Sequence, residues 1–258
     1  MVNVVITGIA GRMGGELLRA FRADPRSRVV AGTVRPGAPT AEAAARLGLP
    51  VDDRLGEAIA RGAEVVVDFT SPQATAAHVE VCASAGAALV IGTTGLSPRE
   101  HEAIEGASRR IPVVFAPNMS VGMNLLFRLV EEAAGALPGF DTEVVEIHHR
   151  HKKDSPSGSA LRLARAIAQG RGGAGEVVHG RRGQVGARPA GEIGMHALRG
   201  GEVAGDHTVF LLGPGERLEL THRASSREAF AAGAVRAALW VKGRPAGLYS
   251  MQDVLAGA

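Results

Sequence analysis

The segment from residue 148 to residue 159 holds the side chains best suited to moving protons. It reads His-His-Arg-His-Lys-Lys-Asp-Ser-Pro-Ser-Gly-Ser. Histidine titrates near neutral pH, and a lysine with a shifted pKa can donate a proton, whereas arginine stays charged. His148 and Lys152 are four residues apart and could lie on the same side of the chain. The pair is therefore a candidate for general acid–base catalysis.

The composition of the whole chain makes this segment stand out. Among 29 basic residues there are only three lysines, Lys152, Lys153 and Lys242. A surplus of arginine is what a GC-rich genome favours, and it carries no functional meaning by itself. Yet two of the three lysines and three of the nine histidines fall between His148 and Lys153. The adjacent lysines indicate a role that arginine cannot fill.

The residues after the lysines resemble the start of a helix that binds an anion. Ser157 can cap a helix, and the backbone N–H groups of Gly158 and Ser159 would be available to a carboxylate. Two alternatives compete with this interpretation. The segment could be a solvated basic turn, or His148, His149 and His151 could bind a metal ion. The flanking cations and the lack of a helical His pair four residues apart disfavour a metal, and we expect none.

A glycine-rich turn near the N-terminus indicates a dinucleotide site. The turn, which follows a predicted strand and opens a predicted helix, reads Gly8-Ile9-Ala10-Gly11-Arg12-Met13-Gly14. Glycines let the backbone approach a pyrophosphate at the helix N-terminus. The spacing departs from the common G-x-G-x-x-G, but the order of strand, glycines and helix is the required one. A tight turn without a ligand is the alternative.

The residue expected to contact the adenosine ribose indicates which cofactor is used. A site for NAD carries an acidic residue about 20 residues after the turn, and this chain has Arg35 near that place. An arginine favours the 2′-phosphate of NADPH, and Arg12 could help to bind it. We therefore expect NADPH to be preferred, with NADH possible. The alternative is that Arg35 is only a solvated loop residue.

Two further segments follow predicted strands on the side where such sheets bind ligands. Small and hydroxyl-bearing residues there suit contact with a nicotinamide and its ribose. The candidate residues are Gly92, Thr93 and Thr94, and Ala116, Pro117, Asn118 and Met119.

The elements that must position these residues change in character along the chain. Up to residue 117, nearly continuous apolar runs alternate with Ala-rich stretches, which predicts a doubly wound parallel sheet. After Asn118 a long helix, a strand and a second helix are followed by a Gly/Arg-rich stretch, 170–191, predicted to be a loop. Three strands without intervening helices then predict a mixed or antiparallel sheet, and a helix ends the pattern. The predicted strands are Val2–Thr7, Val29–Val34, Glu64–Phe69, Ala87–Ile91, Pro112–Phe115, Glu143–His149, Gly194–Leu198, Thr208–Leu212 and Arg217–His222.

Composition excludes several classes of protein. Aromatic residues are 3% of the chain and the net charge is +3, which argues against a nucleic-acid partner. One cysteine excludes an internal disulfide and a cysteine-based zinc site. The N-terminus enters a strand directly, and no apolar run approaches the length that spans a bilayer. We expect a cytoplasmic protein with no membrane partner.

Taken together, these motifs resemble the 4-hydroxy-tetrahydrodipicolinate reductase (dihydrodipicolinate reductase) family of lysine and diaminopimelate biosynthesis. The resemblance runs essentially the full length, and its most specific part is His148–Ala160. It implies a Rossmann-type dinucleotide-binding domain, residues 1–118, completed by 227–258. It also implies an α+β domain, residues 119–226, that binds the substrate and whose open mixed sheet assembles a homotetramer.

The resemblance also implies roles for individual residues. His148 matches the catalytic acid/base and Lys152 the proton donor, while His149, Gly158 and Ser159 match substrate-binding positions. The cofactor-binding positions are Gly8–Met13, Gly92–Thr94 and Ala116–Met119. The implied reaction is the NAD(P)H-dependent reduction of a small cyclic dicarboxylate, 4-hydroxy-tetrahydrodipicolinate. One departure concerns Arg35, since many members carry an acid followed by arginine near that position.

Two other functions are compatible with parts of the sequence. A pyridine-nucleotide reductase of the same architecture could act on a different imine or amino-acid-derived carbonyl. A nucleotide-sensing regulator could keep the dinucleotide domain without chemistry, but the intact pair of His148 and Lys152 argues against it.

Overall fold

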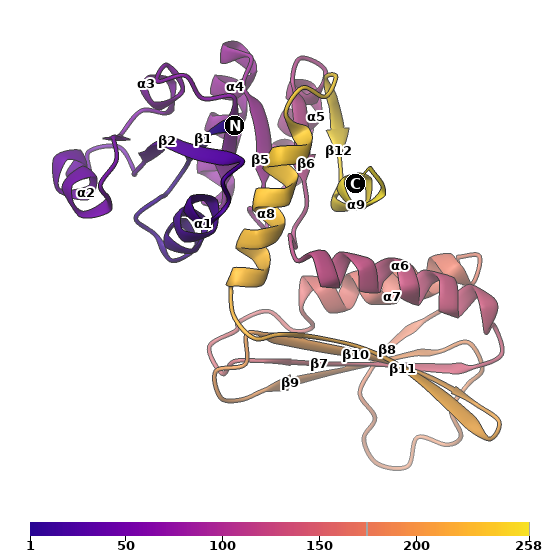
Figure 1. Cartoon of the computed structure of the whole chain (residues 1–258). Coiled ribbons are helices and arrows are strands. Elements are labelled where there is room, and N and C mark those ends of the chain that lie inside the picture. The colour runs from indigo at the N-terminus through magenta and orange to yellow at the C-terminus, as the bar shows by residue number, and fades with distance from the viewer. Residues whose placement is uncertain (174, 258) are drawn as a thin grey trace. The chain divides into compact units, whose positions relative to one another are not determined.

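Short apolar strands alternate with helices in the first part of the chain, and in the computed structural model these strands pair in parallel (Figure 1). The structure describes residues 1–173 and 175–257. Contacts between elements divide it into two units, Met1–Val121 with the segment from Arg227 onward, and Gly122–Ser226.

Within the described residues, the first unit is built on a seven-stranded parallel sheet with the order β12-β6-β5-β4-β1-β2-β3. The chain runs outward from β1 in both directions, which creates the switch point where sheets of this kind bind ligands. The strands are β1 (Val2–Ile6), β2 (Ser27–Thr33), β3 (Val51–Asp52), β4 (Val65–Asp68), β5 (Ala88–Ile91), β6 (Pro112–Phe115) and β12 (Gly247–Tyr249). The helices are α1 (Arg12–Ala23), α2 (Thr40–Leu47), α3 (Leu55–Ile59), α4 (Pro72–Ala85), α5 (Pro98–Ser108), α8 (Glu228–Val241) and α9 (Met251–Ala256).

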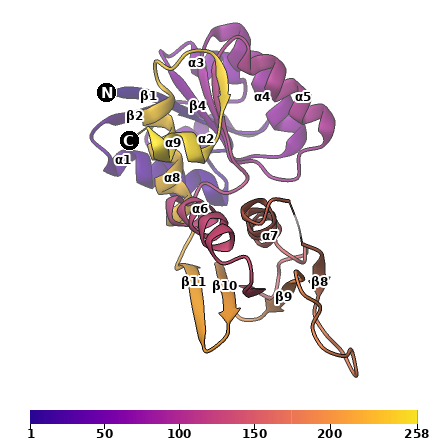
Figure 2. The ribbon, with the colours of Figure 1, turned by 90° about the vertical axis from the view of Figure 1, so that its right-hand side faces the viewer.

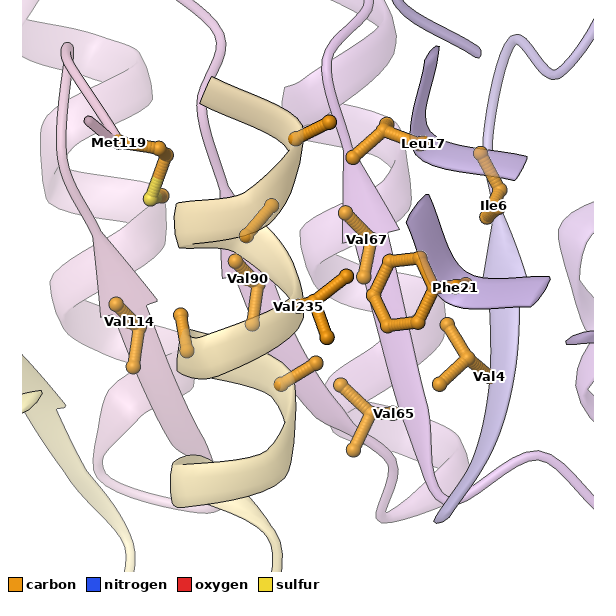
Figure 3. Packing of buried hydrophobic residues seen from close by; sticks show 14 of the residues in the cluster. Val4, Ile6, Leu17, Phe21, Val65, Val67, Val90, Val114, Met119 and Val235 are labelled. Carbon is orange, nitrogen blue, oxygen red and sulfur yellow. The ribbon is translucent and has the colours of Figure 1, made fainter. Parts of the chain in front are cut away.

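Both faces of this sheet are buried, as the continuous apolar runs predict. Because successive side chains of a strand point to opposite faces, Val4 and Ile6 join one core and Val5 joins the other. The first core contains Leu17 of α1 and Val235 of α8 (Figure 3). The second is formed with α3, α4 and α5. The doubly wound parallel sheet predicted from the sequence is thereby confirmed.

The helix α8 reaches this core from the far end of the chain. Its small residues let it lie close to the segment after β6, since a Cβ on Gly233 would overlap the carbonyl oxygen of Met119. A larger residue at Gly233 would therefore force the two segments apart.

The second unit contains a mixed sheet with the order β11-β10-β7-β9-β8. The central strand β7 is parallel to β9 and antiparallel to β10, which confirms the predicted mixed sheet. The elements are α6 (Val121–Ala136), β7 (Asp141–His148), α7 (Gly158–Gly170), β8 (Val177–His179), β9 (Ile193–Arg199), β10 (Gly205–Gly213) and β11 (Glu216–Ala224).

Helices cover one face of this sheet, and no helix of the described residues covers the other, which we call the open face. Both views show α6 and α7 on the same side of the strands (Figures 1 and 2). Val144, Glu146 and His148 of β7 are buried on the covered face. On the open face, Ile147 pairs with Leu198, whose side chain is 45% exposed. The predicted open sheet is therefore present.

Five short elements were missed by the sequence patterns: α2, β3, β8, β12 and α9. Strands of two or three residues carry too few positions for a period to show, and the surrounding sheet supplies their pairing. The stretch 170–191, predicted to be a loop, contains β8, while its residue Ala174 lies outside the described residues.

Candidate active site

The glycine turn between β1 and α1 has the geometry of a binding turn for a pyrophosphate. Gly8 has a φ of +60°, and a Cβ on Gly14 would overlap the carbonyl oxygen of Gly8. No side chain caps α1 at Gly11, and its first turn contains no acidic residue. The positive end of the helix is therefore available to a negatively charged group, and the turn fits a dinucleotide.

The other predicted cofactor residues of this turn differ in exposure. Ile9 is buried in the core, whereas Ala10 and Arg12 are exposed. Arg35 follows β2 and is exposed too, and its carbonyl oxygen accepts a hydrogen bond from the Ala38 N–H at 3.1 Å. Both guanidinium groups thus remain in contact with solvent, where they could bind a phosphate.

A buried polar cluster lies at the ends of β1, β4 and β5. The Asp68 carboxylate accepts hydrogen bonds from the hydroxyls of Thr7 at 2.9 Å and Thr70 at 2.6 Å. The Nδ1 of His78 lies 3.1 Å from its other oxygen. Burial alone would raise the pKa of Asp68, but the contacts with His78, Thr70 and Thr7 outweigh burial and lower it.

The predicted residue Thr93 belongs to this cluster. Its hydroxyl oxygen accepts a hydrogen bond from the Thr70 N–H at 3.1 Å and lies 2.9 Å from the Thr75 hydroxyl. Thr93 is buried while Thr94 is exposed. A Cβ on Gly92 would overlap the Phe69 ring, so a larger residue here would displace that ring. Sequence reasoning placed Asp68 only within a predicted strand and missed its contacts with Thr7, Thr70 and His78.

The predicted segment Ala116–Met119 follows β6 in the same unit. Ala116 and Met119 are buried, and Pro117 is exposed. The side-chain oxygen of Asn118 accepts a hydrogen bond from the Ser120 N–H at 2.9 Å, which fixes the turn before α6.

In the second unit, the end of β7 brings His148 against a buried carboxylate. Nδ1 of His148 contacts Oε2 of Glu146, whose side chain has no exposed surface. Burial alone would raise the pKa of Glu146, but hydrogen bonds from Arg199, His148 and the Ser157 N–H lower it. Since an ionised carboxylate has no proton to donate, the Nδ1–H of His148 donates to Glu146.

The pKa of His148 is lowered by burial, which is the largest effect on it. The positive charges of Lys152 and Arg199 act in the same direction, while contact with Glu146 opposes them. The Nε2 of His148 faces Gly205, where an added Cβ would lie only 2.9 Å away. The missing side chain at Gly205 therefore keeps the space beside Nε2 open.

A second histidine, His207 of β10, lies next to His148. Their ring centroids are 5.2 Å apart with an edge-to-face angle of 78°. Burial lowers the pKa of His207 to about 4, so the ring is neutral near pH 7. Its Nε2 lies 3.1 Å from the Ser157 hydroxyl. Sequence reasoning gave His207 no role, because a lone histidine before a predicted strand has no distinguishing pattern.

The predicted proton donor Lys152 lies in the turn after β7. Its Nζ is 3.0 Å from Asp154, and its N–H donates to the carbonyl oxygen of His149 at 3.1 Å. The Lys152 side chain is 20% exposed. The positive charge of Lys152 lowers the pKa of His148, so the two groups interact electrostatically, as their spacing suggests.

The predicted helix start after the lysines is present. Ser157 caps α7 by accepting a hydrogen bond from the Ala160 N–H at 3.2 Å. Gly158 begins the helix and is exposed. The N–H of His149 donates to the Val203 carbonyl oxygen at 2.8 Å, which ties this predicted substrate residue to the segment before β10.

The described residues contain no group of three or more His, Cys, Asp and Glu side chains that could hold a metal ion. Among the same residues, no helix is both long enough and apolar enough to cross a bilayer.

Comparisons with known proteins relate both units to one family. Residues 2–119 match the family described as dihydrodipicolinate reductase, N-terminus, and residues 122–255 match dihydrodipicolinate reductase, C-terminus. The chain is 52% identical to a 4-hydroxy-tetrahydrodipicolinate reductase of Myxococcus xanthus, with 99% of this chain and 98% of the relative covered. It is 50% identical, at the same coverage, to one from Anaeromyxobacter dehalogenans.

Solved structures share the fold at lower sequence identity. A dipicolinate-bound dihydrodipicolinate reductase from Paenisporosarcina has a TM-score of 0.80 and 24% identity, with 97% of each chain covered. A scyllo-inositol dehydrogenase from Lactobacillus casei has a TM-score of 0.61 and 14% identity, covering 100% of this chain and 93% of that one.

Proposed function

The chain belongs to the dihydrodipicolinate reductase family, and on that premise we propose that it reduces 4-hydroxy-tetrahydrodipicolinate to tetrahydrodipicolinate with NAD(P)H in lysine and diaminopimelate biosynthesis. The observation that carries this proposal is the identity of about half the residues with curated reductases along nearly the whole chain. The alternative of a non-catalytic nucleotide sensor is not favoured by any feature of the site.

The reaction sets requirements that the residues of both units can meet. The substrate loses its hydroxyl as water and gains a hydride and a proton. When bound, the nicotinamide supplies the hydride to one ring carbon. A proton must reach the neighbouring carbon, and the two substrate carboxylates need positively charged or N–H partners.

We assign the proton transfer to His148 and Lys152. The Nε2 of His148 faces the open space beside Gly205, while its Nδ1 is held by Glu146. An imidazole held at one nitrogen can accept or release a proton at the other. Lys152 carries the proton that we expect to be donated, and its ion pair with the exposed Asp154 lies at the protein surface.

We assign the substrate carboxylates to the start of α7. Gly158 and Ser159 lie in its first turn, where the helix dipole favours a negative charge. The exposed Gly158 lets a carboxylate approach the backbone closely. His149 adds a second polar group from the end of β7.

We assign the cofactor to the first unit, at Gly8–Met13, Gly92–Thr94 and Ala116–Met119, and we expect NADPH to be preferred over NADH. Arg35 and Arg12 are exposed and could bind the 2′-phosphate that NADH lacks. Arg35→Ala should raise the KM for NADPH and leave that for NADH unchanged. An unchanged KM for NADPH together with full activity with NADH would remove this argument.

We further propose that the second unit binds the substrate and that its open sheet face assembles a homotetramer. We also propose that the enzyme is cytoplasmic. Leu198 and Leu212 are partly exposed on the open face, and apolar patches of this kind mark interfaces. Light scattering of Leu198→Glu should show smaller particles than the tetramer expected for the unsubstituted protein.

One assay tests the main proposal. The substrate is made enzymatically in the cuvette, and oxidation of NADPH is followed for the unsubstituted protein, His148→Ala and Lys152→Ala. General acid–base groups contribute about 10²–10⁴-fold, and we expect losses in that range for each variant. Undiminished turnover in both variants would refute the catalytic assignment. If the protein oxidised NADPH with other imino acids but not with 4-hydroxy-tetrahydrodipicolinate, the proposed reaction would be refuted.

A further inference from the structure

Glu146 lies two residues before His148 on β7, and its side chain is completely buried on the same face. We propose that Glu146 is a positioning residue for His148, whose ring it holds with the proton on Nδ1 and the Nε2 lone pair facing the space beside Gly205. The inference rests on the proposed function, which takes His148 as the acid–base group.

The contacts of the carboxylate show why this position requires a glutamate. Oε1 accepts hydrogen bonds from the Ser157 N–H at 3.0 Å and from an Arg199 N–H at 2.8 Å. Oε2 accepts from the second terminal nitrogen of Arg199 at 2.9 Å and from Nδ1 of His148. All four partners are therefore donors, and only an ionised carboxylate can accept from all of them.

The same carboxylate joins His148 to two other elements. Arg199, at the end of β9, forms a two-pronged pair with it and balances its buried charge. The Ser157 N–H comes from the residue that caps α7. Glu146 thus fixes the imidazole relative to the helix start that we assign to the substrate carboxylate.

The charged and titratable groups around His148 determine how its pKa would respond to removal of the Glu146 charge. They are Glu146 on the same strand, Arg199 on β9, Lys152 in the turn after β7 and His207 on β10. Glu146 supplies the negative charge that stabilises protonated His148, while Lys152 and Arg199 disfavour it. Without this negative charge, the pKa of His148 would fall further.

Glu146→Gln removes the negative charge and replaces one of the two acceptor oxygens with an NH₂ group that donates hydrogen bonds. If the amide NH₂ takes the place of Oε1, it meets two donors, the Ser157 N–H and Arg199. If it takes the place of Oε2, it meets only one donor, Arg199, and can donate to Nδ1 of His148. The second orientation leaves fewer unsatisfied groups, so His148 should change to the tautomer protonated at Nε2.

Glu143 provides a matched control on the same strand. It lies on the opposite face of β7, where it contacts His196 at 2.7 Å and the guanidinium groups of Arg181 and Arg188. Glu143→Gln therefore also takes a carboxylate away from a histidine and two arginines. A general weakening of the sheet would follow from either substitution, but only Glu146→Gln should alter His148.

The test is nitrogen NMR of the full-length protein labelled with ¹⁵N-histidine, with His148 identified by its absence in His148→Gln. We expect Nδ1–H in the unsubstituted protein and in Glu143→Gln. In Glu146→Gln we expect Nε2–H and a titration midpoint for His148 at lower pH. Parallel kinetics should show a fall in kcat of about 10²-fold or more, the range of general acid–base catalysis.

Two results would overturn the inference. One is that His148 keeps the Nδ1–H tautomer and an unchanged titration midpoint in Glu146→Gln. The other is that Glu143→Gln changes the tautomer and midpoint of His148 as much as Glu146→Gln does. If the unpaired Arg199 unfolds Glu146→Gln, the double variant Glu146→Gln with Arg199→Met removes both charges, and the same two results apply to it. The tautomer is measured without substrate, so a protein inactive on the proposed substrate would refute the proposed function without affecting this measurement.

Discussion

The buried Asp68 pairs with the partly buried His78, with Nδ1 of His78 on α4 3.1 Å from the Asp68 carboxylate at the end of β4. Asp68 has no exposed surface, and its other oxygen accepts hydrogen bonds from Thr7 and Thr70. The methyl group of Thr70 lies 3.0 Å from where a Cβ on Gly8 would be. One carboxylate thereby connects α4 to the two strand ends next to the turn.

We predict that Asp68→Asn weakens binding of NADPH as well as the fold. An asparagine amide cannot accept from all the donors that the carboxylate serves, and breaking a buried pair of this kind costs about 3 kcal/mol. The free energy of unfolding in urea and the Kd of NADPH from fluorescence titration measure the two effects. We expect the Kd to rise about tenfold.

Asp52→Asn is the control for this prediction. Asp52 ends β3 and pairs with Arg61, whose side chain is 45% exposed, so its loss should destabilise the fold less than the loss of Asp68. The Kd of NADPH should not change. If Asp68→Asn also left the Kd unchanged, the carboxylate would support only the fold and not the shape of the turn.

The sequence predicted the parts of the structure that depend on repeated local patterns. Continuous apolar runs such as Glu64–Phe69 predicted strands buried on both faces, and Ser157 predicted a helix cap. Both signals arise within a few residues, where burial and hydrogen bonding depend on neighbours in the chain.

The sequence could not predict contacts between residues far apart in the chain. Glu146 meets Arg199, 53 residues later, only because β9 pairs with β7 in a particular register. His207 meets Ser157 across 50 residues for the same kind of reason. Local patterns carry no information about register between distant strands, so the groups that surround His148 became visible only in the folded chain.

Gly205→Ala should reduce activity while the protein remains folded. The new Cβ would lie 2.9 Å from Nε2 of His148, in the space that we assign to the reacting substrate. We expect kcat/KM to fall at least tenfold, because small misplacements of a catalytic group are costly. Gly215→Ala is the control, since Gly215 also has a positive φ, +79°, and nothing lies within 4 Å of its added Cβ. Equal activity of the two variants would show that the space beside Nε2 is not used.

His207 should make the protein less stable in mild acid. Its pKa is about 4 in the folded protein because it is buried, against about 6.5 in an unfolded chain. The unfolded state therefore binds more protons between these values, and the free energy of unfolding falls as the pH is lowered from about 6.5 to about 4. His207 alone accounts for about 3 kcal/mol of this loss.

The difference between the free energies of unfolding in urea at pH 7 and at pH 4.5 should be smaller for His207→Gln, whose side chain can still reach Ser157. The lowered pKa values of His148 and His222 act in the same direction in both proteins, so the comparison isolates His207. His179→Gln, at the exposed end of β8, is the control and should keep the full difference, because it leaves the buried ring of His207 in place. An unchanged difference in His207→Gln would mean that the buried ring takes up its proton without opening the structure around His148.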